Sequence, residues 1–134
     1  MKNLCLLFYF FGILDAQMET GSDLFTALNS VNEREKNHAK YFIAGFISGH
    51  RFALEGLNPY NMFQERIPND SQYNIFLERK ITDLELYPKE QIVAWEVLFK
   101  VINDYLIQYP DERHHDAKIL IRKSLLEAFR YNNN

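Results

Sequence analysis

The chain has 134 residues, of which 47% are hydrophobic and 15% aromatic, and its formal net charge is −3. This length and composition are typical of one globular domain and exclude an intrinsically disordered chain. No basic stripe occurs in the sequence, so the electrostatic footprint of nucleic-acid binding is missing and we expect no nucleic-acid partner.

The N-terminal segment MKNLCLLFYFFGILDA (residues 1–16) has the organisation of a signal peptide. Lys2 supplies a positive charge, and an uninterrupted apolar run extends from Leu4 to Leu14. This run is shorter than the roughly 20 residues that a transmembrane helix needs. We therefore expect an exported protein, with cleavage after Ala16, no membrane span after cleavage, and a single domain over residues 17–134. The alternative is a buried N-terminal helix.

Cysteine usage limits the chemistry of the exported chain. Cys5 is the only cysteine, and it lies inside the signal segment. Cleavage would leave no thiol, so we expect no disulfide, no cysteine nucleophile and no thiolate metal site.

Two helices are predicted in the first half of the exported chain. Gly21-Ser22-Asp23 offers N-cap chemistry for a short helix over 23–31, and NEREKN (residues 32–37) is either a polar hinge or a solvated helical turn. Residues 38–57 follow the helical period with a broad apolar face. Gly45 and Gly49 lie four positions apart on this helix, so we expect another helix to pack closely against them in the bundle.

The middle of the chain is harder to assign. Residues 58–70 (NPYNMFQERIPND) are loop-like, with two prolines and three asparagines. Ile75, Phe76 and Leu77 fit either a helical turn or a short strand, and we favour a short helix over 71–79 followed by irregular chain.

Two further helices are predicted at the C-terminal end. Pro88 fits the first position of a helix that runs to about residue 108, and Pro110 stops it. A last helix then begins at Asp111 or Glu112, where acidic groups suit the positive helix end. Its expected buried residues are Ala117, Ile121, Ser124, Leu125 and Ala128. The predicted fold class is all-α, a compact bundle of four to five helices.

The most visible candidate for catalysis or metal binding is His114-His115-Asp116. Adjacent residues of a regular helix point about 100° apart, so these two histidines cannot meet at one metal if they lie in a helix. We instead expect His114 to pack at a corner between helices and His115 to be solvated. No HExxH motif, GxSxG elbow or glycine-rich phosphate loop occurs. We therefore expect no enzyme activity, no metal and no cofactor.

A surface for a protein partner is the remaining possibility. Aromatic, methionine and arginine side chains are enriched in interface cores, and the loop 58–70 contains several of them. The alternative is that these aromatic residues fold back onto the core. The expected contact residues are Tyr60, Met62, Phe63, Gln64, Glu65, Arg66 and Asp70.

Three stretches of the chain resemble the Rap/Tai family of immunity proteins, which inhibit peptidoglycan amidase toxins delivered by type VI secretion systems. GSDLFTALNS (residues 21–30) is similar to the opening helix of the family, and AKYFIAGFISG (residues 39–49) to its second helix. YLIQYPDERHHDAKILIRKSLLEAF (residues 105–129) resembles the family pattern of helix end, proline, acidic residue, Arg-His and a final helix. Residues 58–87 carry no such likeness.

The resemblance implies a periplasmic protein that binds a cell-wall amidase, blocks its catalytic Cys–His site and forms a homodimer. The loop 58–70 would be the inhibitory element. Pro110, Arg113 and His114, together with Gly45 and Gly49, would be structural, and we expect Arg113 to anchor the helix corner through charge-assisted hydrogen bonds.

One departure from the family concerns cysteines. Members often carry a pair of cysteines at the positions that hold Leu28 and Ala39 here, and an apolar pair can fill the core where that disulfide would lie.

Two other hypotheses compete with the immunity function. The first is a small periplasmic helical chaperone or stress-binding protein, which would share the export signal, the size and a helical dimer. The second is an exported enzyme of unknown class, for which the histidine cluster is the only support.

Overall fold

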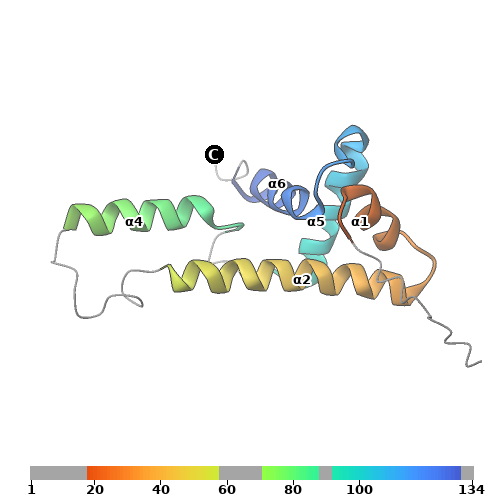
Figure 1. Cartoon of the computed structure of the whole chain (residues 1–134), viewed down its shortest axis with the longest axis horizontal. Helices are drawn as coiled ribbons and strands as arrows, with labels where there is room; N and C mark the ends of the chain where they lie inside the picture. Colours follow the sequence, from red (N-terminus) through yellow and green to blue (C-terminus); the bar gives the residue numbers. More distant parts are fainter. Residues whose placement is uncertain (1–17, 58–70, 88–91, 131–134) are drawn as a thin grey trace, which may run out of the picture.

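The computed structural model describes residues 18–57, 71–87 and 92–130 of the chain (Figure 1). The described residues form α-helices and no extended strand; an isolated bridge pairs Thr20 with Asp116. The all-α bundle predicted from the sequence is confirmed. Its elements are α1 (Gly21–Leu28), α2 (Glu33–Gly56), α4 (Ser71–Leu84), α5 (Trp95–Gln108), the short 3-10 helix η1 (Pro110–Glu112) and α6 (Ala117–Arg130).

The core lies where α1, α5 and α6 meet the inner face of α2. Helix α1 packs on α2, α5 and α6, and α5 packs on α6. Leucine and isoleucine side chains from all four helices fill this region. Their burial removes apolar surface from water and stabilises the fold by roughly 25 cal/mol per Å² of that surface. The fully buried aliphatic side chains of the core are Leu24, Ile43, Ile47, Leu98, Ile102, Leu106, Leu120, Ile121 and Leu125.

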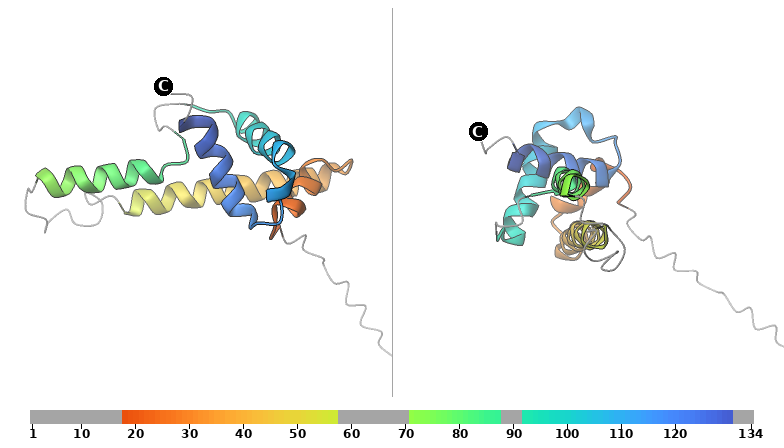
Figure 2. Two further views of the ribbon diagram at one scale, coloured as in Figure 1. Left: turned by 90° about the horizontal axis from the view of Figure 1, so that it is seen from above. Right: turned by 90° about the vertical axis from the view of Figure 1, so that its left-hand side faces the viewer.

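Helix α2 forms one edge of the molecule. Figure 1 shows α1, α4 and α6 on one side of it, and the end-on view in Figure 2 shows α5 running down beside it. The C-terminal half of α2 extends past the core, with α4 running beside it. The molecule is therefore a helical core from which α4 and the end of α2 project together.

Both helices in the first half begin at polar caps. Thr20 and Asp23 form a reciprocal capping box, so α1 starts at Gly21 rather than at the predicted residue 23 and ends at Leu28 instead of 31. The Asn32 side chain accepts a hydrogen bond from the backbone N–H of Arg34, so the segment 32–37 is the capped start of α2 and not a hinge.

Helix α4 is longer than predicted, and α5 is shorter. Helix α4 continues to Leu84, five residues beyond the expected end, without forming a strand. Helix α5 begins at Trp95, so the prediction of a helix from Pro88 was wrong: residues 92–94 are not helical, and Ala94 is the N-cap. A proline is permitted at the first position of a helix, but it does not by itself start one. A first turn is stabilised mainly by burying its apolar side chains, and Ile92 is fully exposed.

The last helix also begins later than predicted. Asp111 and Glu112 belong to η1, and α6 begins at Ala117. Its cap is Asp116, whose Oδ1 accepts a hydrogen bond from the backbone N–H of Lys118. The expected buried face of this helix is confirmed at Ala117, Ile121, Ser124 and Leu125; Ala128 is half-buried, and Leu120 joins the core.

The predicted close packing at Gly45 and Gly49 was wrong. Both glycines are exposed, and a Cβ atom added to either one meets nothing within 4 Å. The helix instead buries the neighbouring stripe, which contains Ile43, Ile47 and Leu54. Larger aliphatic side chains yield more free energy on burial than glycines do, so they decide which face turns inward.

Candidate functional site

The loop that the sequence singled out for partner binding lies outside the described residues. Tyr60, Met62, Phe63, Gln64, Glu65, Arg66 and Asp70 all belong to the segment 58–70, which joins the end of α2 to the start of α4. The site is therefore described from the two helices that flank this segment.

These flanking helices form what we call the arm: residues 50–57 of α2 together with α4. In Figures 1 and 2 the arm projects from the side of the core opposite α1. Five large apolar side chains on the described part of the arm face solvent. Phe52 is 78% exposed, Ile75 and Phe76 are each 54% exposed, Leu57 is 53% exposed and Leu84 is 38% exposed. Exposed apolar side chains gathered on a projecting element are typical of a surface that binds another protein.

The base of the arm is fixed to the core by polar contacts. His50 Nε2 lies 2.8 Å from the carbonyl oxygen of Leu84, which joins α2 to the end of α4. His50 is half-buried at the edge of the core, and its polar ring nitrogen meets the end of α4. Arg130 donates a hydrogen bond to the carbonyl of Asp83, and the buried side chain of Leu86 joins the core directly after α4. The arm therefore starts from a defined anchor.

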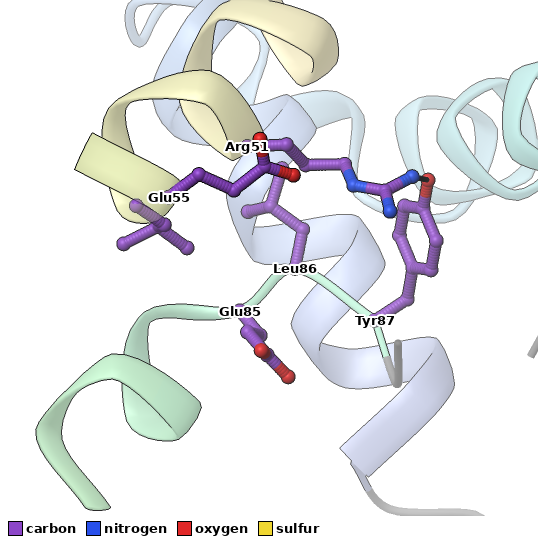
Figure 3. A pocket seen from close by; sticks show the side chains of 6 residues that line it. Arg51, Glu55, Glu85, Leu86 and Tyr87 are labelled. Atoms are coloured by element: carbon purple, nitrogen blue, oxygen red, sulfur yellow. Dashed lines mark hydrogen bonds between the residues drawn. The ribbon is translucent and has the colours of Figure 1, made fainter. Parts of the chain in front are cut away.

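A shallow hollow lies beside this anchor. It encloses about 330 Å³, including open solvent, and is lined by Arg51, Leu54, Glu55, Glu85, Leu86 and Tyr87. Arg51 extends from α2 toward the ring of Tyr87, and its Nη1 donates to the Tyr87 hydroxyl at 3.1 Å (Figure 3). Its lining combines the apolar side chains of Leu54 and Leu86 with the charged side chains of α2 and of the chain that follows α4.

The helix corner before α6 is organised by Arg113, as predicted. Its Nε donates to the carbonyl oxygen of Leu106 at 2.6 Å, and the guanidinium lies 3.6 Å from the centre of the Phe25 ring. The backbone carbonyl of Arg113 accepts from the N–H of Ser22 at 2.8 Å. One residue thus joins α5, η1 and α1, and Pro110 at the start of η1 ends the preceding helix.

The two adjacent histidines have a different arrangement from the one predicted. His114 is exposed rather than packed, and its Nδ1 donates to the carbonyl of Asp111 at 2.7 Å. His115 is exposed as predicted. Both lie in a turn and not in a helix, so their ring centres come within 3.9 Å of each other. The assumption of a regular helix failed here because η1 ends before these residues.

A second polar cluster, which sequence reasoning missed, locks α5, η1 and α6 together. Lys123 donates to Glu112 at 2.6 Å, and the Tyr105 hydroxyl donates to Glu112 at 2.7 Å. The Lys123 hydrogen bond lowers the pKa of Glu112, and burial followed by the Glu112 contact raises the pKa of Tyr105 to about 12. The pKa of Lys123 is raised, mainly by its hydrogen bond to Glu112. These shifts hold each group in its ordinary charge state at neutral pH, which suits a structural role.

The partners of these residues do not follow one another within a single helix. Phe25 pairs with Arg113, and Lys123 with Glu112 across the turn before α6. No local pattern in the sequence marks either pair, because the packing of α1 and α6 on α5 brings them together.

Two other features are absent from the described segments. In residues 18–57, 71–87 and 92–130, no three His, Cys, Asp or Glu side chains gather as metal ligands would. Within the same segments, no helix combines the length and apolar character needed to cross a membrane.

Comparison of the chain with protein-family models, with curated proteins and with solved structures finds no match. The class that fold and site together define is an all-α bundle with a projecting, partly apolar arm.

Proposed function

We propose that this chain is a periplasmic immunity protein that binds and inhibits a peptidoglycan amidase toxin of a type VI secretion system. The proposal rests on the resemblance of residues 21–30, 39–49 and 105–129 to the Rap/Tai family. The structural observation that supports it is the arm, with Ile75 and Phe76 half-exposed on a helix that projects from an anchored base.

The helical core and the projecting arm meet the physical requirements for inhibiting a hydrolase. An inhibitor that blocks a catalytic groove must keep its shape, because ordering a flexible element on binding costs free energy. The core and the Arg113 corner supply the rigid part. The arm supplies a projecting part whose apolar side chains can enter a groove.

The first experiment is a pull-down from periplasmic extract with this protein as bait, followed by mass spectrometry. The proposal predicts recovery of one cell-wall hydrolase in stoichiometric amount. The purified hydrolase is then assayed on peptidoglycan with increasing inhibitor, and activity is expected to fall to zero at equimolar ratio. A captured hydrolase that keeps full activity at excess inhibitor contradicts the proposal.

The chaperone hypothesis gives a different result in the same experiment. Exposed apolar side chains such as Ile75 and Phe76 also suit clients that are partly unfolded. A chaperone is expected to retain many proteins in substoichiometric amounts, and more of them at low pH. That outcome would favour the chaperone hypothesis over the inhibitor hypothesis.

A further inference from the structure

The turn before α6 holds two exposed imidazole rings side by side. The ring centres of His114 and His115 are 3.9 Å apart, and the ring planes are tilted by 41° to each other. In a regular helix the two side chains would point about 100° apart, which is why the sequence predicted no metal site here. Both residues lie between η1 and α6 instead, so that objection to a shared metal ion does not apply.

The hydrogen bonding of His114 leaves one particular ring nitrogen for a ligand. Its Nδ1 lies 2.7 Å from the backbone carbonyl oxygen of Asp111. A carbonyl oxygen can only accept, so Nδ1 carries the hydrogen, and in the neutral ring the lone pair is on Nε2. Histidines that bind metals commonly donate their other ring N–H to a carbonyl in this way, which fixes the orientation of the ring.

The backbone of this turn is held on both sides. The N–H of Gly21 donates to the carbonyl of His115 at 2.9 Å, and the N–H of Ser22 donates to the carbonyl of Arg113 at 2.8 Å. The N–H of His115 donates to the carbonyl of Glu112 at 2.9 Å. A ligand therefore meets a turn that already has its shape, and little conformational entropy of the backbone is lost on binding.

We propose that His114 and His115 together bind one divalent transition-metal ion, with Nε2 of His114 as one of the ligands. In a tetrahedral zinc site, with Zn–N distances of about 2.0–2.1 Å, two ligand nitrogens lie about 3.3 Å apart. Ring centres at 3.9 Å are close to this spacing, so small side-chain rotations bring a nitrogen of each ring to the same ion. Imidazole suits zinc, copper and nickel, whereas calcium and magnesium prefer oxygen ligands.

The remaining coordination positions of the ion belong to water. Within the described residues, no third His, Cys, Asp or Glu side chain gathers with the two histidines. Asp116 follows them directly, but its Oδ1 accepts from the backbone N–H of Lys118 at 2.7 Å and its Oδ2 lies 3.6 Å from Nζ of Lys118. The site is therefore open, unlike the closed four-ligand zinc sites that have a structural role.

Metal binding at this turn does not depend on the proposed inhibition. The turn is hydrogen-bonded to the start of α1, whereas the arm projects from the opposite side of the core (Figure 1). The two proposals can therefore succeed or fail separately.

The first test is calorimetric titration of zinc chloride into the protein recovered from cells that express the whole chain, without a polyhistidine tag. We expect one zinc ion per chain and no binding of calcium. His114→Gln and His115→Gln should each weaken zinc binding by about tenfold or more. The matched control is His38→Gln, at an exposed histidine of α2, which should bind zinc like the unaltered protein. Since all three side chains are exposed, thermal unfolding without zinc should show an intact fold in each variant.

The second test identifies the coordinating nitrogen by ¹⁵N NMR of the histidine rings. The proposal predicts that zinc shifts the Nε2 resonance of His114 while its Nδ1 stays protonated. Coordination through Nδ1 of His114 overturns it. The same holds if the unaltered protein binds no zinc, or if either the His114 or the His115 variant keeps full affinity.

Discussion

The guanidinium of Arg113 lies 3.6 Å above the ring of Phe25 while its Nε donates to the carbonyl of Leu106 at 2.6 Å. Three elements of the fold therefore meet at one side chain. A lysine would keep the charge but has no planar group that can stack on the ring and donate to the carbonyl together.

We expect Arg113→Lys and Arg113→Met to lower the free energy of unfolding by about 2–3 kcal/mol, since a charged hydrogen bond and a cation–π contact are lost. Urea unfolding measures this loss. The control is Arg122→Met, at an exposed position of α6. Its free energy of unfolding should stay within roughly 0.5 kcal/mol of that of the unaltered protein. Equal effects of the two methionine variants would contradict a special role for Arg113.

Gly21 occupies a position with no room for a side chain. A Cβ there overlaps Cδ1 of Leu120 and lies 3.1 Å from the Cα of Arg113. We expect Gly21→Ala to cost about 1–3 kcal/mol through overpacking.

The control for this substitution is Gly49→Ala, which meets open space in a helix and should stabilise the protein by up to about 1 kcal/mol. Leu120→Val should partly offset Gly21→Ala in a double-mutant cycle, because it removes the overlapping methyl group. Additive effects of the two substitutions would show that the overlap is not the cause.

Helix α5 begins without a side-chain cap. Ala94 has extended backbone angles, φ −65° and ψ 142°, but makes no side-chain hydrogen bond to the first turn. We expect Ala94→Ser to raise the free energy of unfolding by about 0.5–1 kcal/mol. Asn32→Ala removes the cap of α2 and should lower it by about 1 kcal/mol, which calibrates the measurement. A loss of stability in Ala94→Ser would mean that the serine prefers another local hydrogen bond.

Acid should destabilise the fold through Glu112 and Asp23. Lys123 lowers the pKa of Glu112 from its ordinary value of 4.5, and the backbone N–H of Thr20 lowers the pKa of Asp23 from 3.8. Because both folded-state pKa values are lowered, the stabilisation is present above the unfolded values and is lost as pH falls below about 4.5.

Unfolding in urea at a series of pH values between about 7 and 3 tests this dependence. Glu112→Gln removes the titrating group, so its stability should fall less steeply with acid than that of the unaltered protein. Parallel curves for the two proteins would rule out Glu112 as a source of the acid dependence.

The arm is the expected contact with a partner. Replacing Phe76 by Glu places a charge on an exposed apolar position of α4 and should weaken binding of the captured hydrolase by about tenfold or more. Ile107→Glu, equally exposed on α5, is the matched control, and calorimetric titration measures both. If the Phe76 variant binds the hydrolase with unchanged affinity, the arm is not the binding surface.

The sequence by itself determined the helical class and most helix positions. Apolar side chains that recur at the 3.6-residue helical period share one face of a helix, and this pattern identified α2 and α5. The anchoring role of Arg113 was expected from the resemblance of residues 105–129 to the Rap/Tai pattern, and its hydrogen bond to the carbonyl of Leu106 agrees with it. The helix starts at Trp95 and Ala117 were not predicted. Pro88 and the acidic pair at 111–112 permit earlier helix starts, but a helical turn there is stable only if its apolar side chains are buried in the core.

Only the tertiary structure decided which face of α2 turns inward. The stripe with Phe42 and Phe46 and the neighbouring stripe with Ile43 and Ile47 are both apolar enough to pack. The packing of the other core helices buries Ile43 and Ile47 fully and leaves Phe42 and Phe46 partly buried. The pairing of Phe25 with Arg113 and the projection of α4 have the same origin. Contacts between residues distant in the chain depend on the joint packing of several helices, and no local segment of sequence contains that information.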